Sequence, residues 1–246
     1  MSHGIYTAAA GARARHWQVD VIANNLANAS TPGFRQIKVA FEEVMDKATS
    51  DSRHLVQVRP GRMSSKAGAL VETGNTFDLA LRGQGFFLTE EADGKRRLVR
   101  SAPFQRNAEG NLVDPSGRAL LTRGGSKLRV ESNQRVTISG AGEVFLTNMD
   151  TSTTPSEKLA GIINIVDVPN RAGLAPAGEG AYMTTDLSGP EFGTTAEVAS
   201  GWIEQSNVNP VEVMVELIEL QRGYQSMLRA INTYKEADQK LVKAVG

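Results

Sequence analysis

The segment NPVEVMVELIELQRGYQSMLRAINTYKEADQKLVKA at residues 209–244 has the clearest periodicity in the chain. Apolar residues follow one another at alternating intervals of four and three, which is the spacing of a coiled-coil seam. They are Val213, Leu217, Leu220, Tyr224, Met227, Ile231, Tyr234 and, one heptad later, Leu241. Asn209 is a natural N-cap, Pro210 suits the first helical position, and Glu212 completes a capping box. The segment therefore predicts one long helix over residues 210–244.

A second, weaker stripe of the same period lies near the N-terminus. Ile5, Ala12, Val19 and Leu26 are seven residues apart, and Ile22 falls at an intervening position. Because a narrow apolar seam needs a partner to cover it, we expect the two terminal helices to pair as a coiled-coil-like domain. Periodicity alone leaves open whether this pair is self-contained or needs copies of itself to complete the burial.

The region between the helices has the period of β structure. Phe77, Leu79 and Leu81 alternate with more polar residues, and glycine-containing turns recur along the chain. The fold class expected is therefore α+β and discontinuous, with an irregular, mainly antiparallel β domain inserted between the helices. The expected domains are a terminal helical domain at 1–34 with 205–246, an extended connector at 35–74, and a central β domain at 75–204.

Composition excludes several classes of function. Lys plus Arg and Asp plus Glu are 27 each, so the net charge gives no basic footprint for nucleic acid. The chain has no cysteine, which excludes disulfides and thiolate metal sites. No apolar run approaches 18 residues, so direct membrane insertion is not expected. The N-terminal segment lacks the basic and apolar regions of a secretory signal, so any export is expected to occur without cleavage of one.

Signatures of catalysis or cofactor binding are not found in the sequence. The three histidines have no metal-ligand spacing, and there is no H-E-x-x-H, G-x-S-x-G or Walker A motif. Gly83-Gln84-Gly85 is only a lone G-x-G before the apolar residues Phe86 and Phe87, which indicates a hairpin turn. We therefore expect no enzyme activity, no cofactor and no metal. The alternative from another class is a β-rich periplasmic peptidoglycan hydrolase that uses paired carboxylates.

The N-terminal helix is expected to end in an unusual group of amides, within ANNLANASTPGF at residues 23–34. Asn24 and Asn28 lie one turn apart on a helix, and Asn25 forms an i,i+3 pair with Asn28. Pro32 then stops the helix and Gly33 permits a positive φ. One interpretation is a C-cap that contacts only its own chain. The other is a rigid elbow at a subunit contact, with Phe34 anchoring the exit toward the β domain.

Four segments of the chain resemble, in order, those of bacterial flagellar rod and hook proteins. The N-terminal segment is ANNLANASTPGFR at 23–35. The central ones are GALVETGNTFDLALRGQGFF at 68–87 and VRSAPFQRNAEGNLVDPSGRALL at 99–121. The last is QSNVNPVEVMVELIELQRGYQS at 205–226. Because both ends and the middle match, the chain is identified as similar to this family as a whole.

The resemblance implies a structural subunit of the flagellar basal-body rod, the shaft that crosses the periplasm. It implies as partners other rod proteins and further copies of the chain in a helical assembly, and the type III export apparatus during secretion. Within the family, the short length and the SNVNP sequence favour a proximal-rod protein over a distal-rod or hook paralogue. The residues expected to form assembly contacts are Ile5, Ala12, Val19, Ile22, Asn24, Asn25, Leu26, Asn28, Pro32, Gly33, Phe34, Val213, Leu217, Leu220, Tyr224, Met227, Ile231, Tyr234 and Leu241.

Overall fold

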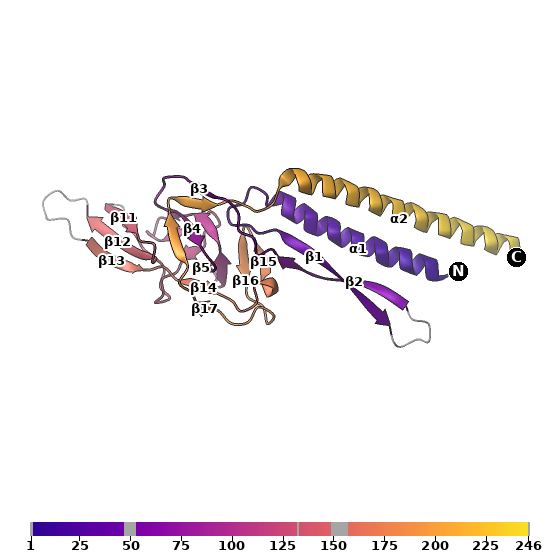
Figure 1. Ribbon diagram of the computed structural model, residues 1–246, viewed down its shortest axis with the longest axis horizontal. Coiled ribbons are helices and arrows are strands. Elements are labelled where there is room, and N and C mark those ends of the chain that lie inside the picture. The colour runs from indigo at the N-terminus through magenta and orange to yellow at the C-terminus, as the bar shows by residue number, and fades with distance from the viewer. Residues whose placement is uncertain (1, 47–52, 132, 149–156, 246) are drawn as a thin grey trace. The chain divides into compact units, whose positions relative to one another are not determined.

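The computed structural model describes residues 2–46, 53–131, 133–148 and 157–245. The chain divides into two compact units. A helical unit consists of residues Met1–Ala27, Ile37–Arg62 and Val208–Gly246, and a β unit consists of Asn28–Gln36 and Met63–Asn207. The α+β class with helices at both ends and many antiparallel strands is confirmed (Figure 1).

The described residues of the helical unit form two helices and one pair of strands. Helix α1 is Ser2–Ala27 and helix α2 is Pro210–Val245, and the two pack side by side (Figure 1). Strand β1, Ile37–Asp46, pairs with β2, Arg53–Met63, and β1 also contacts α1. The expected bounds of the C-terminal helix are confirmed, including its cap, because the Val211 N–H donates to Asn209 Oδ1 at 3.1 Å.

The β unit is built from short strands in several small sheets. The largest sheet runs β15-β16-β6-β5-β10-β9-β8, with β14 and β17 attached to β5. Its strands are β5 Phe86–Glu90, β6 Arg96–Val99, β8 Gln105–Arg106, β9 Leu112–Val113, β10 Ala119–Leu120, β14 Ile165–Asp167, β15 Ala175–Gly178, β16 Ala181–Met183 and β17 Phe192–Gly193. A 3-10 turn, η1, spans Arg171–Gly173.

Three smaller sheets also lie among the described residues of the β unit. Their orders are β11-β12-β13, β18-β4-β7 and β19-β3. Their strands are β3 Leu70–Glu72, β4 Asp78–Arg82, β7 Ser101–Pro103, β11 Gln134–Ile138, β12 Glu143–Asn148, β13 Glu157–Ile162, β18 Glu197–Ser200 and β19 Trp202–Glu204. Segments 28–36 and 201–207, which are distant in sequence, both belong to this unit.

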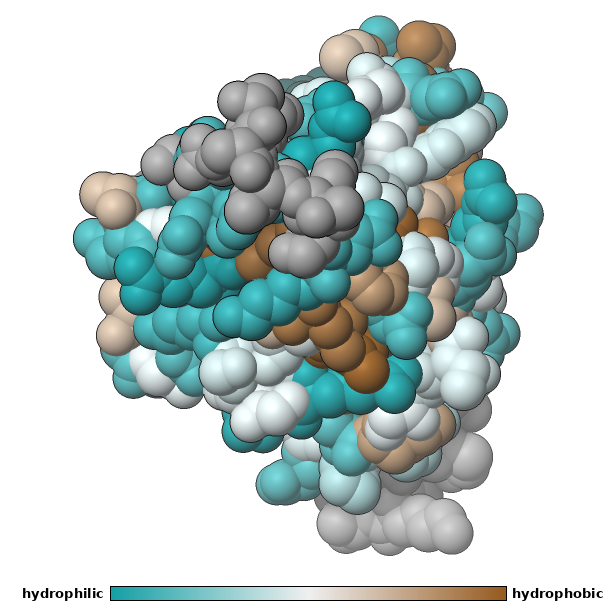
Figure 2. Space-filling model, turned by 90° about the vertical axis from the view of Figure 1, so that its left-hand side faces the viewer, coloured by the Kyte–Doolittle hydropathy of each residue, from teal (hydrophilic) through white to brown (hydrophobic). Residues whose placement is uncertain are grey.

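The core of the β unit forms where the inward faces of these strands meet. Leu79, Leu112, Leu120, Val144 and Ile163 are fully buried in one apolar cluster. A smaller cluster gathers around Phe86 and Tyr182. Each fully buried side chain of this size contributes about 1.5–3 kcal/mol to stability. The surface drawn in Figure 2 is mostly hydrophilic, with hydrophobic residues gathered near its centre and others scattered toward its edges.

Residues 35–74, expected as an extended connector, include strands β1, β2 and β3, and the expected domain bounds stay a prediction. One turn differs in form from what the sequence pattern indicates. The interpretation of Gly83-Gln84-Gly85 as a hairpin turn is wrong, because the strands on either side, β4 and β5, belong to different sheets. Both glycines adopt positive φ, 98° and 140°, so the turn carries the chain from one sheet to the next.

Candidate assembly site

The inner face of α2 is the seam that the sequence predicts. Val213 and Leu220 are buried, with 2% and 6% of their surface exposed. Leu217, Tyr224 and Met227 are partly buried along the same line. The ring of Tyr224 lies 5.8 Å from that of His16 on α1, centroid to centroid. Since α1 and α2 contact each other, this face is covered within the helical unit.

Over residues 211–218, the opposite face of α2 is also apolar, but it is exposed. Val211, Met214, Val215 and Ile218 are 68%, 50%, 53% and 50% exposed. At about 100° per residue, these four side chains fall within an arc of about 100° that is centred roughly opposite the seam. We call this set the outer stripe. A helix with two apolar faces can bury both only if each face has a partner.

Helix α1 is buried over a wider arc than the heptad stripe indicates. Ala12, Ala14, Ile22 and Asn25 are the most buried of its described side chains, while Val19 and Leu26 are partly buried. The heptad stripe contains neither Ala14 nor Asn25. The wider arc follows from the two neighbours of α1, because this helix contacts both α2 and β1.

Asn25 forms a two-bond clasp on the backbone of β1 within the helical unit. Its Nδ2 donates to the Ile37 carbonyl, and its Oδ1 accepts from the Ile37 N–H, each at 2.8 Å. The side chain is 0% exposed. One amide thus supplies both the donor and the acceptor that a neighbouring strand would supply. Asn24, in contrast, is exposed on the helix surface.

The residues after α1 form a tight turn in the β unit. The Thr31 Oγ1 donates to Asn28 Oδ1 at 3.2 Å, and the Phe34 N–H donates to the Thr31 carbonyl at 3.2 Å. Gly33 has φ of 69°, and a Cβ there would lie 2.7 Å from the Ser101 nitrogen. Only glycine therefore fits this position. Phe34 is 3% exposed, so its ring anchors the segment in the β unit.

Asn207 makes a similar clasp inside the β unit. Its Oδ1 accepts from the Gln36 N–H at 2.7 Å, and its Nδ2 donates to the Lys66 carbonyl at 2.8 Å. The Gln36 carbonyl in turn accepts from the Ser64 N–H at 2.8 Å. Asn207, the first asparagine of SNVNP, therefore joins segments from three distant parts of the sequence.

A buried ion-pair network lies beside these segments. Glu204 is 1% exposed and accepts from two guanidinium groups, Arg100 Nε at 2.6 Å and Arg35 Nη2 at 3.3 Å. The remaining donors of Arg100 bond the carbonyls of Leu81, Gly83 and Gly85 at 2.6–2.8 Å. Burial lowers the pKa of Arg100, and Glu204 opposes that shift. The carbonyls of the glycine turn thus bind the Arg100 guanidinium group.

Tyr182 closes the network on the side of the N-terminal segment. Its hydroxyl oxygen accepts from the Arg35 N–H at 2.8 Å, and the side chain is 1% exposed. Burial raises the pKa of Tyr182 to about 12, because the phenolate would be desolvated. The hydroxyl therefore stays protonated across the physiological range.

The predicted contact residues fall into several groups in the structure. Buried or partly buried residues of α1 and α2 are Ala12, Val19, Ile22, Asn25, Leu26, Val213, Leu217, Leu220, Tyr224, Met227 and Ile231, and those of the turn are Asn28, Pro32, Gly33 and Phe34. Asn24 and Tyr234 are exposed. The side chains of Ile5 and Leu241 lie outside those that the structure describes. For all the residues of this predicted set, a role at a subunit contact stays a prediction.

Sequence reasoning missed the charged network and the outer stripe. Arg35, Arg100 and Glu204 each directly follow an apolar residue, and this is the local signal for a buried charge that the sequence offers. The outer stripe is visible in the sequence as apolar residues that fall off the heptad seam.

Two further properties of the described residues bear on function. Among them, no group of three His, Asp or Glu side chains is placed to hold a metal ion. In the same part of the chain, neither helix has a stretch apolar enough for a membrane span.

Comparison with known proteins identifies the family. Three family models match in order along the chain. Residues 5–35 match the flagella basal body rod protein family, residues 80–146 match the D1 domain of flagellar hook protein FlgE/F/G, and residues 199–244 match the C-terminal region of flagellar basal body rod FlgEFG protein.

Relatives that match over nearly their whole length carry names from the same family. The chain is 28% identical to flagellar basal-body rod protein FlgF of Caulobacter vibrioides, covering 100% of this chain and 99% of that one. It is 30% identical to FlgG of Agrobacterium fabrum, covering 93% and 94%, and 29% identical to FlgG of Bacillus subtilis, covering 98% of each. The chain therefore belongs to the family of flagellar basal-body rod proteins and is a structural rod subunit of the FlgF or FlgG kind.

Proposed function

We propose that this rod subunit assembles through its terminal helices, with the outer stripe of α2 covered by a neighbouring subunit. The supporting observation is that α2 carries a second apolar face over residues 211–218, and that among the described residues only its inner face is covered. Exposed apolar residues that adjoin one another on a surface are typical of interaction sites. The seam between α1 and α2 then serves as a coiled-coil-like framework, and the outer stripe serves as the contact.

A charge on the outer stripe tests this proposal. Ile218→Glu places a carboxylate at a position that is 50% exposed in the chain, so the free subunit is expected to fold with nearly unchanged stability. In the assembly the same carboxylate would be buried without a partner, which is strongly unfavourable. A strain that produces only this variant is expected to lose motility.

The matched control is Glu219→Gln, an exposed change on the adjacent helix position and away from the outer stripe. It is expected to leave motility unchanged. Normal motility with Ile218→Glu, at wild-type protein levels, would contradict an assembly role for the outer stripe.

The assembly that such contacts build is a helical tube. Heterologous contacts that do not close into a ring generate open helical structures, as a shaft requires. The proposed partners are other rod proteins and further copies of this chain, and the proposed role of the tube is to transmit torque across the periplasm. Such a role needs no catalysis, and the peptidoglycan-hydrolase alternative is not favoured by the relatives. Release of soluble fragments from peptidoglycan by the purified chain would contradict the non-enzymatic assignment.

The position along the rod is proposed to be proximal. The basis is the short chain and the SNVNP sequence, while relatives named FlgF and FlgG are similar to a comparable degree. Quantitative mass spectrometry of isolated basal bodies distinguishes the two positions. A few copies per particle support the proximal rod, and several times that number would place the chain in the distal rod instead.

Export is proposed to use the flagellar type III apparatus without removal of an N-terminal signal. The basis is the N-terminal sequence itself, which forms α1 and matches the rod family from residue 5 onward. Mass spectrometry of the chain from basal bodies is expected to find the N-terminal peptide of this sequence. Its consistent absence, with a new N-terminus inside α1, would contradict this route.

A further inference from the structure

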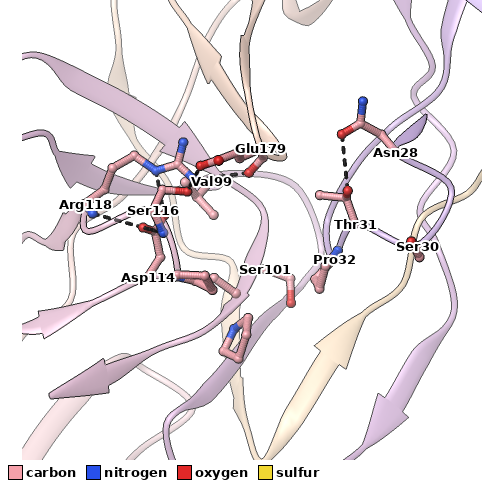
Figure 3. A pocket seen from close by; sticks show the side chains of 13 residues that line it. Asn28, Ser30, Thr31, Pro32, Val99, Ser101, Asp114, Ser116, Arg118 and Glu179 are labelled. Carbon is pink, nitrogen blue, oxygen red and sulfur yellow. Dashed lines mark hydrogen bonds and ion pairs between the residues drawn. The ribbon is translucent and has the colours of Figure 1, made fainter. Parts of the chain in front are cut away.

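A hollow of about 370 Å³ lies in the β unit between three loops (Figure 3). The turn after α1 forms one wall, the Asp114–Arg118 turn forms another, and the tip of the β15–β16 hairpin forms the third. The lining includes Pro32, Ala102 and Pro103, which are apolar, and the polar rim includes Ser30 and Ser116. A cavity of about 150 Å³ already accepts benzene, so this hollow has room for a long side chain.

Glu179 stands at the edge of this hollow and of a second one. The second hollow, of about 510 Å³, shares Ser116, Arg118 and Glu179 with the first. Figure 3 shows the side chains of these three residues grouped on one side, with the Ser30–Pro32 wall across the hollow from them. The carboxylate of Glu179 is therefore presented to both concave surfaces.

The backbone at Glu179 is one that glycine would adopt more easily. Its φ is 48°, between Gly178 at 90° and Gly180 at 72°, and it is the only non-glycine residue with positive φ in the part of the chain that the structure describes. Arg118 braces this tip, because its Nη1 and Nη2 donate to the Gly178 and Glu179 carbonyls at 3.4 and 3.1 Å. A side chain kept in a strained position is a reason to look for a role of that side chain.

Glu179 is also the unbalanced charge of the hollow. Arg118 Nε donates to Asp114 Oδ2 at 2.6 Å, and both side chains are buried, so these two charges cancel. The Glu179 carboxylate is exposed and lies within ion-pair distance of no Lys or Arg among the described residues. Among the hydrogen bonds of the described residues, only its Oε2 is engaged, by a hydrogen bond from the Ser116 hydroxyl. One carboxylate oxygen therefore remains for a partner.

We propose that this hollow receives a lysine side chain from a second copy of the chain, with the ammonium group bound by Glu179. The aliphatic stem of lysine lies on the apolar lining and its charged end reaches the rim, as amphipathic side chains do. One available oxygen suits the point charge of an ammonium better than the two-pronged fork of an arginine. The proposal rests on the proposed function, because it requires copies of the chain to meet in the rod.

Competitive incorporation tests the proposal. Cells that make wild-type and variant chains at equal levels are used to isolate basal bodies, and the ratio of the two chains is measured by mass spectrometry. Glu179→Gln keeps the shape of the side chain and removes its charge. The variant is expected to be incorporated about fivefold less than wild type, because a partly exposed ion pair contributes about 1 kcal/mol. The matched control is Glu109→Gln, an exposed carboxylate on a turn of the same unit that lines neither hollow, with an expected ratio of one.

Glu179→Gly separates assembly from folding. Glycine relieves the positive φ, so the purified variant is expected to unfold at the same or a higher temperature than wild type. It is nevertheless expected to be incorporated less well, because the carboxylate is absent. Incorporation of either Glu179 variant at the wild-type ratio would overturn the proposal. Absence of the wild-type chain itself from basal bodies would instead overturn the proposed function.

The identity of the partner is tested by coupling in wild-type basal bodies. A carbodiimide joins a carboxylate to an amine in direct contact with loss of water. The expected product is a peptide that joins Glu179 to a lysine of this same sequence, and it should be missing from the purified monomer. No coupled Glu179 peptide, or coupling to a lysine of a different rod protein, would overturn the assignment to a second copy.

Discussion

Replacement of Asn25 by alanine is expected to destabilise the helical unit by about 2–4 kcal/mol. The change removes both 2.8 Å hydrogen bonds to the Ile37 backbone and leaves its N–H and carbonyl without those partners. Each of these two groups costs about 1–3 kcal/mol if it is left buried and unpaired, which gives about 2–6 kcal/mol in total. Ile37 is only partly buried, so water satisfies part of the loss and the estimate stays at the lower end of that sum.

Two measurements on the purified chain test the Asn25 prediction. Urea unfolding followed by Trp17 fluorescence, in a Trp202→Phe background, reports on α1, and amide hydrogen exchange reports on Ile37. Asn25→Ala should lower the unfolding midpoint and speed exchange of the Ile37 amide. The exposed neighbour provides the control, and Asn24→Ala should change both measurements much less. An Asn25→Ala chain within 0.5 kcal/mol of wild type, with unchanged Ile37 exchange, would refute the clasp as a source of stability.

Three other expectations concern the β unit. Gly33→Ala should destabilise this unit by at least about 1–2 kcal/mol in thermal unfolding, because alanine disfavours a φ of 69° and its Cβ would meet the Ser101 nitrogen. Unchanged stability of the variant would contradict this turn geometry. Glu204→Gln should cost about 3–5 kcal/mol, because two buried guanidinium groups lose their counter-ion, and a loss below 1 kcal/mol would contradict the network. Above pH 10 the unfolded state loses the Tyr182 proton while the folded state keeps it to about pH 12, so the free energy of unfolding should fall by up to about 3 kcal/mol across that window. A Tyr182→Phe chain should show a smaller fall.

The helices and their caps could be predicted from the sequence because their signals are local. The 3.5-residue spacing of the apolar side chains, together with Asn209 and Pro210, defines α2 to within a residue or two. The break after α1 follows equally from Pro32 and Gly33, and the positive φ expected of Gly33 is confirmed. Period and capping act over a few residues, so they can be recognised without knowing the tertiary contacts.

The contacts of the candidate site could not be predicted, since they join residues far apart in the chain. Asn25 looked like a helix cap, but its partner is the backbone of Ile37 on a strand. Glu204 and Arg100 are 104 residues apart, and nothing in the local pattern pairs them. The Gly83–Gly85 turn was wrongly predicted as a hairpin for the same reason. Which sheet β4 and β5 join depends on the distant strands that pair with them.

Whether assembly covers the outer stripe of α2 can be measured by the accessibility of one thiol on that stripe. The chain has no cysteine, so Val215→Cys introduces a single thiol at a position that is 53% exposed. Maleimide labelling is measured on the purified subunit and on isolated basal bodies from cells whose motility the variant supports. If neighbouring subunits cover the stripe, the free subunit should be labelled rapidly and the chain in the basal body should be strongly protected. Equal labelling in the two states, with the chain present in the particle, would contradict this coverage.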